Sequence, residues 1–517
     1  MVGVPGRSKA CQPCKKRRVA CDQQQPKCSQ CSKRKQDCIY HLGCIFVLAE
    51  AGSHKTVYKK SDSQVHVNDV AIKPQHRANG KHDSAGLNVR SQTSAELQVA
   101  RLARTPTQGY AIQQALVATA ISEGQSSSSY TLPSMLAKSL QLDAPGYMYA
   151  APLACFAAWR GRRDGNATLI SASHQLYIRA LRETQVALYD PQIVLADSTL
   201  AACNALGLFE ALECPDRSIS GYQWHRDACC RLVQLRGPAA HVDGFGHILF
   251  LSIRPFGILE AVEQARPNFL SDPEWMTIPW LSNVKAPMDV LVDTLTRGPA
   301  ILRKARHLEA GLTSARPEDT LARMLEIVYD MSCVLYELDV FYEDYEQTTQ
   351  VPQCWETDSF EQESPDLVFQ PVLHFADLGA ATTLTLYWAV LAMAWVSLAD
   401  LLNGCMQAGM QDLFFSTFHA QREELNNLRR PLATYEDMTM EVLRDHWLDN
   451  ARKVLGSVAY CTTESSIESG PPRVATALSM IIDILKGRLG ATHEYRWAVR
   501  ARQAIGEKWL RLAKFQI

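Results

Sequence analysis

The 517-residue sequence lacks the short motifs that mark the common enzyme classes. It has no phosphate-binding G-x-x-x-x-G-K-S/T loop and no G-x-S-x-G elbow. Gly244 and Gly246 begin a dinucleotide-type pattern, but the third glycine of that pattern is missing. The histidines, for example His225, His241 and His247, do not have the spacing of metal ligands. These absences argue against an enzyme, and we expect no catalytic residues.

The sequence also lacks a coiled-coil repeat and a secretory signal. Apolar residues recur at helical spacing in two fragments, residues 95–103 and 112–121, which Pro106 and Gly109 separate. A coiled coil needs about three to four heptads, so we expect none in this segment. Without a signal peptide we expect a reducing compartment, in which cysteines bind metal more readily than they form disulfides.

Charge is distributed unevenly along the chain. The net charge is only -1, with 53 Lys and Arg residues against 54 Asp and Glu residues. Residues 1–40 nevertheless contain ten basic and two acidic residues, whereas residues 324–421 contain 15 acidic residues and no Lys or Arg. We therefore expect the first segment to attract a polyanion in a salt-dependent way, and the rest of the chain to be neutral toward it or repelled.

Six cysteines near the N-terminus have a spacing that indicates a metal site. The pattern is C-x2-C-x6-C-x6-C-x2-C-x6-C, formed by Cys11, Cys14, Cys21, Cys28, Cys31 and Cys38. Two tetrahedral zinc ions need eight sulfur bonds, which six thiolates supply only if two of them bridge. By the symmetry of the two halves, Cys11 and Cys28 are the natural bridging pair. We predict two Zn²⁺ ions; a disulfide framework and unrelated buried thiols are the alternatives.

Basic residues follow the C-x2-C pair in each half of this pattern. They are Lys15, Lys16, Arg17 and Arg18 in the first half, and Lys33, Arg34 and Lys35 in the second. A metal cluster would hold both runs rigidly, which favours contacts with nucleic acid. A solvated charge patch or a nuclear import signal is the alternative interpretation.

Residues 11–38, with the basic run after the second cysteine and Pro26 between the halves, resemble the fungal zinc binuclear cluster (Zn2Cys6) transcription factors. The resemblance implies a short helix and an extended strand in each half, with Cys11 and Cys28 bridging the two Zn²⁺ ions. It also implies that basic residues enter the major groove of double-stranded DNA.

The resemblance assigns roles to the basic residues. Arg17 and Arg18 are expected to read a CGG-type triplet. Phosphate contacts are expected from Lys15, Lys33, Arg34 and Lys35. Ala20 stands where the family commonly has a basic residue, so one phosphate contact of the family is not expected here.

The remainder of the chain has the pattern of a large helical domain. Amphipathic stretches predict helices over residues 174–188, 199–212, 321–345 and 474–489, with Asp197 as the cap of the second. We predict a mostly α protein in three parts. These are a Zn2Cys6 DNA-binding domain over residues 7–42, a largely disordered linker over 43–130 and an all-α regulatory domain over 131–517.

The helical part resembles, more diffusely, the fungal-specific transcription factor domain that follows the zinc cluster in such proteins. The pieces that carry the resemblance are Trp224-His225, Leu235-Arg236-Gly237-Pro238, Leu249-Phe250 with Arg254, Phe269-Leu270, Pro273-Glu274-Trp275 and Leu386-Tyr387-Trp388-Ala389. The resemblance implies regulation, self-association or a response to an effector.

Two stretches of the helical part permit more than one interpretation. Residues 378–399 contain no charged residue and are long enough to span a bilayer, but their hydroxyl side chains and acidic flanks favour a buried central helix and no membrane partner. Residues 337–366 combine acidic and aromatic residues, which suggests a surface for coactivators. A helix end followed by a solvated loop is the alternative for this second stretch.

Together these features predict a nuclear, zinc-dependent, sequence-specific DNA-binding regulator of RNA polymerase II transcription, either a monomer or a homodimer. The resemblance adds that proteins of this kind commonly control a secondary-metabolite biosynthetic gene cluster. The alternative is a zinc-cluster protein whose helical domain carries an enzymatic or protein-interaction role, with DNA binding secondary.

Overall fold

The computed structural model describes residues 150–215, 217–311, 317–349, 351–357, 365–407, 440–463, 470–488 and 493–514, with scattered positions from 409 to 424. Near the N-terminus it describes Cys14, Arg17, Val19, Cys21, Asp22 and residues 29–34. The chain divides into two units, residues 1–95 and residues 96–517. The predicted linker over residues 43–130 lies outside the described residues, as do the two fragments tested for a coiled coil.

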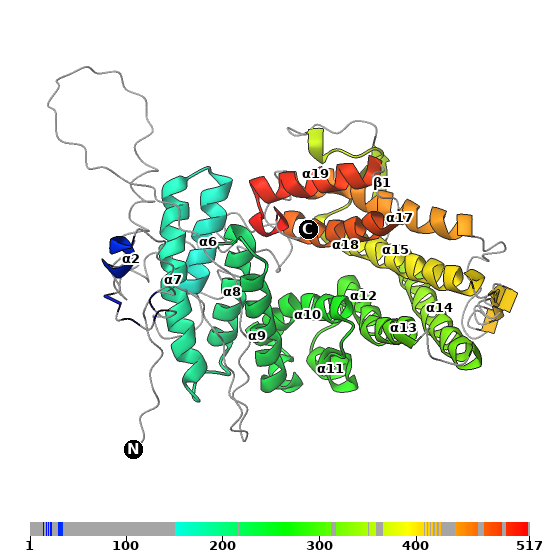
Figure 1. Cartoon of the computed structure of the whole chain (residues 1–517), viewed down its shortest axis with the longest axis horizontal. Coiled ribbons are helices and arrows are strands. Elements are labelled where there is room, and N and C mark those ends of the chain that lie inside the picture. Colours follow the sequence, from blue (N-terminus) through cyan, green and yellow to red (C-terminus); the bar gives the residue numbers. More distant parts are fainter. Residues whose placement is uncertain are drawn as a thin grey trace. The chain divides into compact units, whose positions relative to one another are not determined.

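The larger unit is built mainly from helices (Figure 1). In chain order they are α6 Ala150–Arg163, α7 Ala167–Tyr189, α8 Asp197–Glu213, α9 Ser220–Arg236, α10 Gly244–Gln264, α11 Pro273–Thr277, α12 Pro287–Leu295, α13 Gly298–Gly311, α14 Pro317–Thr348, α15 Leu378–Gln407, α17 Met440–Cys461, α18 Gly470–Arg488 and α19 His493–Lys508. Short 3-10 turns lie between them: η2 Pro238–His241, η3 Phe269–Ser271, η4 Ile278–Trp280, η5 Pro365–Leu367 and η7 Arg511–Lys514. The prediction of a mostly α protein is confirmed.

The helix α15 packs against α14, α17 and α18 (Figure 1). It begins after Asp377, whose carboxylate accepts a hydrogen bond of 2.7 Å from the backbone N–H of Ala380. Its hydroxyl groups are satisfied within the helix, because Thr382 and Ser397 donate to the carbonyl oxygens of Leu378 (2.8 Å) and Met393 (2.9 Å). An apolar helix with its polar groups paired in this way is suited to a protein interior.

Among the described residues, α10 and α15 are long and apolar enough to cross a membrane by length and composition. Their most apolar windows are 61% and 78% buried inside the protein, respectively. The burial of α15 agrees with the predicted central helix over residues 378–399. A core helix of a large domain and a membrane span have similar composition, and packing against neighbouring helices distinguishes them.

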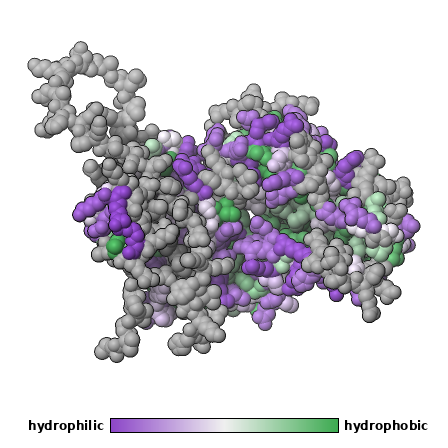
Figure 2. All heavy atoms as spheres, viewed as in Figure 1, coloured by the Kyte–Doolittle hydropathy of each residue, from purple (hydrophilic) through white to green (hydrophobic). Residues whose placement is uncertain are grey.

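The other half of the larger unit is formed by α6 to α9, which pack on one another in sequence order. The helix α10 contacts α8 and α9 on one side and α12 and α13 on the other, so it connects this group to the rest of the unit. The last described turn, η7, contacts both α19 and α8. The C-terminal residues therefore return to the helices that begin the unit. On the face in Figure 2, hydrophilic residues cover much of the described surface, and apolar ones show between them.

Two details of secondary structure differ from the sequence prediction. The predicted helices are present within α7, α8, α14 and α18, but Asp197 does not cap the second of them. Ala196 occupies the cap position, Asp197 is the first residue of α8, and its carboxylate pairs with Arg236 of α9. The second detail is one short pair of strands in the helical domain, which no pattern in the sequence indicated. The strands β1 (Cys354–Thr357) and β2 (Val372–Phe375) pair antiparallel, with Cys354 opposite Phe375.

The acidic and aromatic stretch at residues 337–366 is partly a packing surface. Phe341 and Tyr345, in the last turns of α14, are 7% and 8% exposed. Tyr342 stacks on Tyr387 of α15 with a ring distance of 5.2 Å. Phe341 and Tyr342 thus hold α14 against Tyr387 of α15, and the buried Phe341 and Tyr345 are not available to a coactivator in the folded unit. Trp355 of β1 is 44% exposed, which makes it accessible.

A buried carboxylate connects the two ends of the larger unit. Glu213, at the end of α8, has a fully buried side chain. Its Oε1 accepts a hydrogen bond of 2.6 Å from Nε of Arg162 in α6, and its Oε2 lies 3.2 Å from Nε2 of His174 in α7. Arg511 of η7 approaches the same carboxylate at 3.7 Å. One charge thus joins α6, α7, α8 and the C-terminal turn.

We predict that Glu213→Gln destabilises the larger unit by about 3 kcal/mol, because it leaves the buried guanidinium of Arg162 without its counter-charge. Urea unfolding of the full-length protein, followed by circular dichroism at pH 7, measures the change. The matched control is Glu326→Gln, which breaks the pair of Glu326 with Lys304, whose side chains are 57% and 37% exposed. The control should cost less than about 1 kcal/mol. Equal effects of the two variants would contradict the assigned role of Glu213.

The pKa of Glu213 predicts how the stability of the larger unit changes in acid. Burial alone would raise the pKa of Glu213, but hydrogen bonds from His174 and Arg162 and the charges of Arg162 and Arg511 outweigh it and hold the pKa below 4.5. A lowered folded pKa means that the stabilisation is complete above the unfolded value and is lost as the pH falls through the folded value. The stability difference between the native protein and Glu213→Gln should be constant from about pH 7 to pH 5 and shrink below about pH 4.5. A difference that persists at pH 2 to 3 would show that the charge of Glu213 is not its source.

Candidate metal centre and nucleic-acid interface

The described part of the cysteine-rich segment includes the second cysteine of each half, Cys14 and Cys31. Both side chains are 0% exposed. Cys21, the third cysteine of the first half, is half-buried. The predicted ligands Cys11, Cys28 and Cys38 lie outside the described residues.

The two halves have similar local structure around these buried thiols. Cys14 and Arg17 are helical, and the backbone N–H of Val19 donates to the carbonyl of Cys14 at 3.1 Å. Cys31 lies in the helix α2 (Ser29–Lys33), and the N–H of Arg34 donates to its carbonyl at 3.2 Å. Each half therefore places a buried cysteine in a short helical turn, as the resemblance implies.

Asp22 connects the end of the first half to the start of the second. The backbone N–H of Ser29, the first residue of α2, lies 3.2 Å from both carboxylate oxygens of Asp22. A carboxylate at this position satisfies an otherwise unpaired N–H and favours the positive end of the helix. The sequence analysis assigned no role to Asp22, because it lies seven residues before Ser29 and not at the capping position that a local pattern would reveal.

The basic residues divide into exposed and inward-facing ones. Lys33 and Arg34 are exposed at the end of α2, where they are free to contact a phosphate. Arg17 is half-buried, and its Nη1 is buried with no hydrogen-bond partner among the described residues. Lys15, Lys16, Arg18 and Lys35 lie outside the described residues.

The described residues fit a bound zinc ion. A five-residue helix such as α2 is far below the roughly 12 to 15 residues that an isolated helix needs, so something other than its backbone must hold it. Two buried thiols on two such turns supply soft sulfur donors, which Zn²⁺ prefers. In small domains of this type the free energy of metal binding is the free energy of folding.

Comparison with known families agrees with this geometry. Residues 9–42 match the family model described as the fungal Zn(2)-Cys(6) binuclear cluster domain. The N-terminal segment is therefore a zinc binuclear cluster domain. The match supports zinc binding, DNA binding and a role in transcription regulation, and the name of the domain implies two zinc ions.

The match ends at residue 42, and the resemblance of the helical unit to a fungal regulatory domain stays a prediction. An uncharacterised protein of Emericella nidulans is 30% identical over 176 residues, which are 32% of this chain and 37% of that protein. The chain thus aligns with well under half the length of this relative. No solved structure matches the chain.

Several of the pieces that carried the second resemblance meet in the core of the larger unit. Trp275 of α11 stacks on Phe250 of α10 at a ring distance of 5.9 Å and meets Phe269 edge to face at 4.8 Å. The fully buried guanidinium of Arg254 pairs with Asp293 of α12. These residues pack α10, α11 and α12 together, which is a structural role. The Leu386-Tyr387-Trp388-Ala389 piece lies in α15 instead.

The glycines and histidines considered for catalysis are also used in packing. His241 is fully buried, and its Nδ1 lies 2.9 Å from the carbonyl oxygen of Gly246, while Nδ1 of His247 lies 2.8 Å from the carbonyl oxygen of His241. A Cβ at Gly246 would stand 2.5 Å from the carbonyl oxygen of Ala240, so only glycine permits this approach of η2 to α10. Gly246 is explained by the packing of η2 on α10.

We predict that zinc removal exposes the cysteines of the cluster and no others. Full-length protein treated with a strong chelator and then with iodoacetamide should become labelled at Cys14 and Cys31, because the metal holds their buried turns. Cys155 and Cys203 provide internal controls, since both are fully buried in the larger unit and burial raises their pKa, that of Cys203 to about 12. Mass spectrometry of the labelled peptides measures the change. Labelling of Cys14 and Cys31 that is the same with and without chelator would argue against a zinc-held fold.

Proposed function

We propose that the protein is a zinc-dependent, sequence-specific DNA-binding regulator of RNA polymerase II transcription that acts in the nucleus. The observation that carries the proposal is the zinc cluster match over residues 9–42. The described geometry is consistent with it, because buried Cys31 and exposed Lys33 and Arg34 lie on the same short helix. A small DNA-binding domain needs this arrangement, with its metal ligands in the interior and its cationic side chains at the surface, where they can contact DNA.

The electrostatics of the chain favour DNA at this segment and not elsewhere. Residues 1–40 carry ten basic and two acidic residues, and a cluster of two zinc ions and six thiolates lowers the charge of this segment only by two. The remainder of the chain is acidic overall, with a net charge of -9. Binding should therefore be localised to the zinc cluster and weaken as salt increases.

Some of the basic residues would position the domain on DNA, and others would read the base sequence. Exposed Lys33 and Arg34, with Lys15, Lys16 and Lys35, would contact phosphates and fix the orientation of the domain. Arg17 and Arg18 would read a CGG-type triplet, since a guanidinium binds O6 and N7 of guanine in a bidentate way.

The helical unit would then regulate DNA binding by the zinc cluster domain. We further propose that the helical unit is not catalytic. Its support is that His241, His247 and Gly246 of the described residues are engaged in packing. Self-association as a homodimer and control of a secondary-metabolite gene cluster are parts of the proposal that rest on the resemblance alone.

A selection on random duplex DNA with the zinc-loaded full-length protein tests the proposal. We expect enrichment of a CGG-type motif that disappears when the selection is repeated with chelator. No enrichment with zinc bound would reject sequence-specific DNA binding by this protein.

Substitutions separate the two roles of the basic residues. Arg17→Ala or Arg18→Ala should cost about 1 to 3 kcal/mol per lost bidentate contact and relax the preference for the motif. Lys33→Ala should weaken binding to cognate and random DNA by the same factor. Arg179→Ala, an exposed arginine of α7 in the larger unit, is the control that should change neither. Equal losses on both kinds of DNA for Arg17, Arg18 and Lys33 would refute the division of roles. Titration of labelled duplexes measures all four variants.

A further inference from the structure

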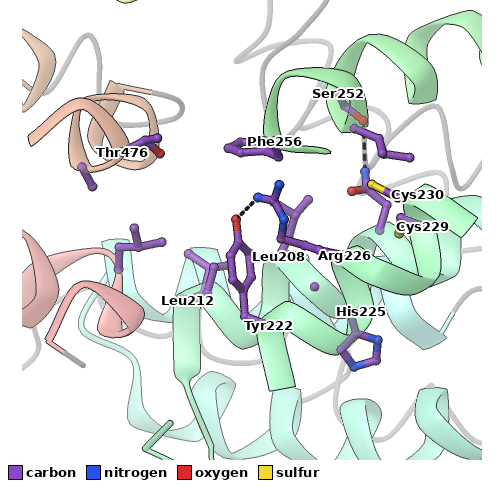
Figure 3. Close-up of a pocket in the computed structure, with 16 residues that line it drawn as sticks. Leu208, Leu212, Tyr222, His225, Arg226, Cys229, Cys230, Ser252, Phe256 and Thr476 are labelled. Carbon is purple, nitrogen blue, oxygen red and sulfur yellow. Dashed lines mark hydrogen bonds between the residues drawn. The ribbon is translucent and has the colours of Figure 1, made fainter. Parts of the chain in front are cut away.

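A cavity of about 90 Å³ in the larger unit has no role in the function proposed above. Its walls come from α8, α9 and α10, from the beginning of α18 and from Leu510 near the C-terminus (Figure 3). The cavity therefore lies where the first helices of the unit meet its last ones. A molecule bound there would contact segments that are about 300 residues apart in the chain.

Most of the cavity wall is apolar or uncharged. Leu208, Leu212, Ile253 and Leu510 supply hydrocarbon surface. The polar group of Ser252 is occupied, because its hydroxyl donates to the carbonyl of Leu249 at 2.8 Å and accepts from Asn204 at 3.2 Å.

The histidine and the two cysteines of the wall are neutral near pH 7. Burial lowers the pKa of His225 to about 4, so its imidazole is uncharged. Burial likewise raises the pKa of Cys230 to about 11 and that of Cys229 well above 9.0, so both remain thiols. The interior thus has a low polarity and no anionic group of its own.

Among the described residues that line the cavity, Arg226 is the one cation, and it faces the cavity (Figure 3). Its guanidinium lies 4.4 Å from the ring centre of Phe256 and 5.1 Å from that of Tyr222, and its Nη1 donates to the Tyr222 hydroxyl at 2.6 Å. No ion pair joins it to a carboxylate of the described residues. Two aromatic rings therefore fix the orientation of a guanidinium that retains unpaired donors.

The acidic groups nearest to Arg226 are engaged with each other. Asp227 and Glu260 share a hydrogen bond, and neither lines the cavity. Burial and the neighbouring Asp227 raise the pKa of Glu260 to about 7, although the charge of Arg226 lowers it.

We propose that this cavity binds a small apolar monocarboxylate, with its carboxylate on Arg226 and its hydrocarbon part between α8, α10 and α18. A guanidinium offers two parallel N–H groups that match one carboxylate. A single arginine in an apolar wall suits one negative charge and not the two of a phosphate monoester. The volume of about 90 Å³ limits the enclosed part of the ligand to a short chain.

Hexanoate is the probe that tests this site on the zinc-loaded full-length protein, with hexan-1-ol and hexylamine as neutral and cationic analogues. Ligand-detected NMR titration should give saturable binding of hexanoate with a Kd roughly in the micromolar to millimolar range. Hexan-1-ol should bind about tenfold more weakly or worse, because it cannot form the charged hydrogen bonds. This comparison uses the native protein and does not depend on any variant folding.

Substitutions test whether Arg226 is the residue that binds hexanoate. Arg226→Gln should reduce the affinity for hexanoate about tenfold or more, to the level of the alcohol, and Arg226→Lys should retain part of it. Arg231→Gln is the matched control, because Arg231 lies on the same helix, does not line the cavity and bonds to Gln234. It should leave the affinity unchanged. Circular dichroism establishes that each variant is folded.

Three outcomes would overturn the proposal: no saturable binding of hexanoate up to about 10 mM, equal binding by Arg226→Gln, or preference for hexylamine. A preference for hexylamine would show that Asp227 and Glu260, and not Arg226, determine the electrostatic potential in the cavity. None of these outcomes bears on DNA binding, so this proposal and the proposed function can fail independently.

Discussion

The removal of one long apolar helix from water organises the larger unit. The 30 residues of α15 include an uncharged stretch that water solvates poorly, and its burial is favourable by about 25 cal/mol for each Å² of apolar surface. Burial on all sides requires several partners, and α14, α17 and α18 supply them. The aromatic residues at the end of α14 belong to this contact. Acidic residues lie next to them in the sequence because the end of α14 passes from the core to the surface.

Buried ion pairs have a different role in the same unit, because they join elements that are distant in sequence. Glu213 connects α6, α7 and the C-terminal turn, and Arg254 connects α10 to α12. A buried ion pair adds little net stability compared with an apolar pair of the same shape, but removal of one partner is costly. Such contacts therefore specify which helices meet. Arg226 differs from these residues, because aromatic rings and not a carboxylate surround it.

The zinc cluster unit depends on another kind of force. The residues that the cysteine pattern spans are too few to bury a large apolar core, and α2 has only five residues. Metal–thiolate bonds replace the missing hydrophobic contribution, with the carboxylate of Asp22 at the start of α2 as a local addition. Because Cys31 is buried on one side of α2, the same helix can leave Lys33 exposed, with Arg34 directly after it. The same bonds that fold the unit thus present its cations to DNA.

The sequence by itself was sufficient for the zinc binuclear cluster domain and for the helical class, since both depend on spacing along the chain. The cysteine pattern is local, and 3.6-residue periodicity located the cores of α7, α8, α14 and α18. Contacts between distant segments could not be read in this way. Asp197 had the sequence of a helix cap, but Arg236, 39 residues away, draws its carboxylate into an ion pair. The strands β1 and β2 are four residues each, too short for a periodic signal, and exist because they pair with each other. Gly246 belonged to an incomplete dinucleotide-type pattern, and the close approach of the Ala240 carbonyl explains why glycine stands there. The cavity beside Arg226 was decided only by the tertiary structure, because its walls come from α8, α9, α10, α18 and Leu510, and no single segment contains the pattern.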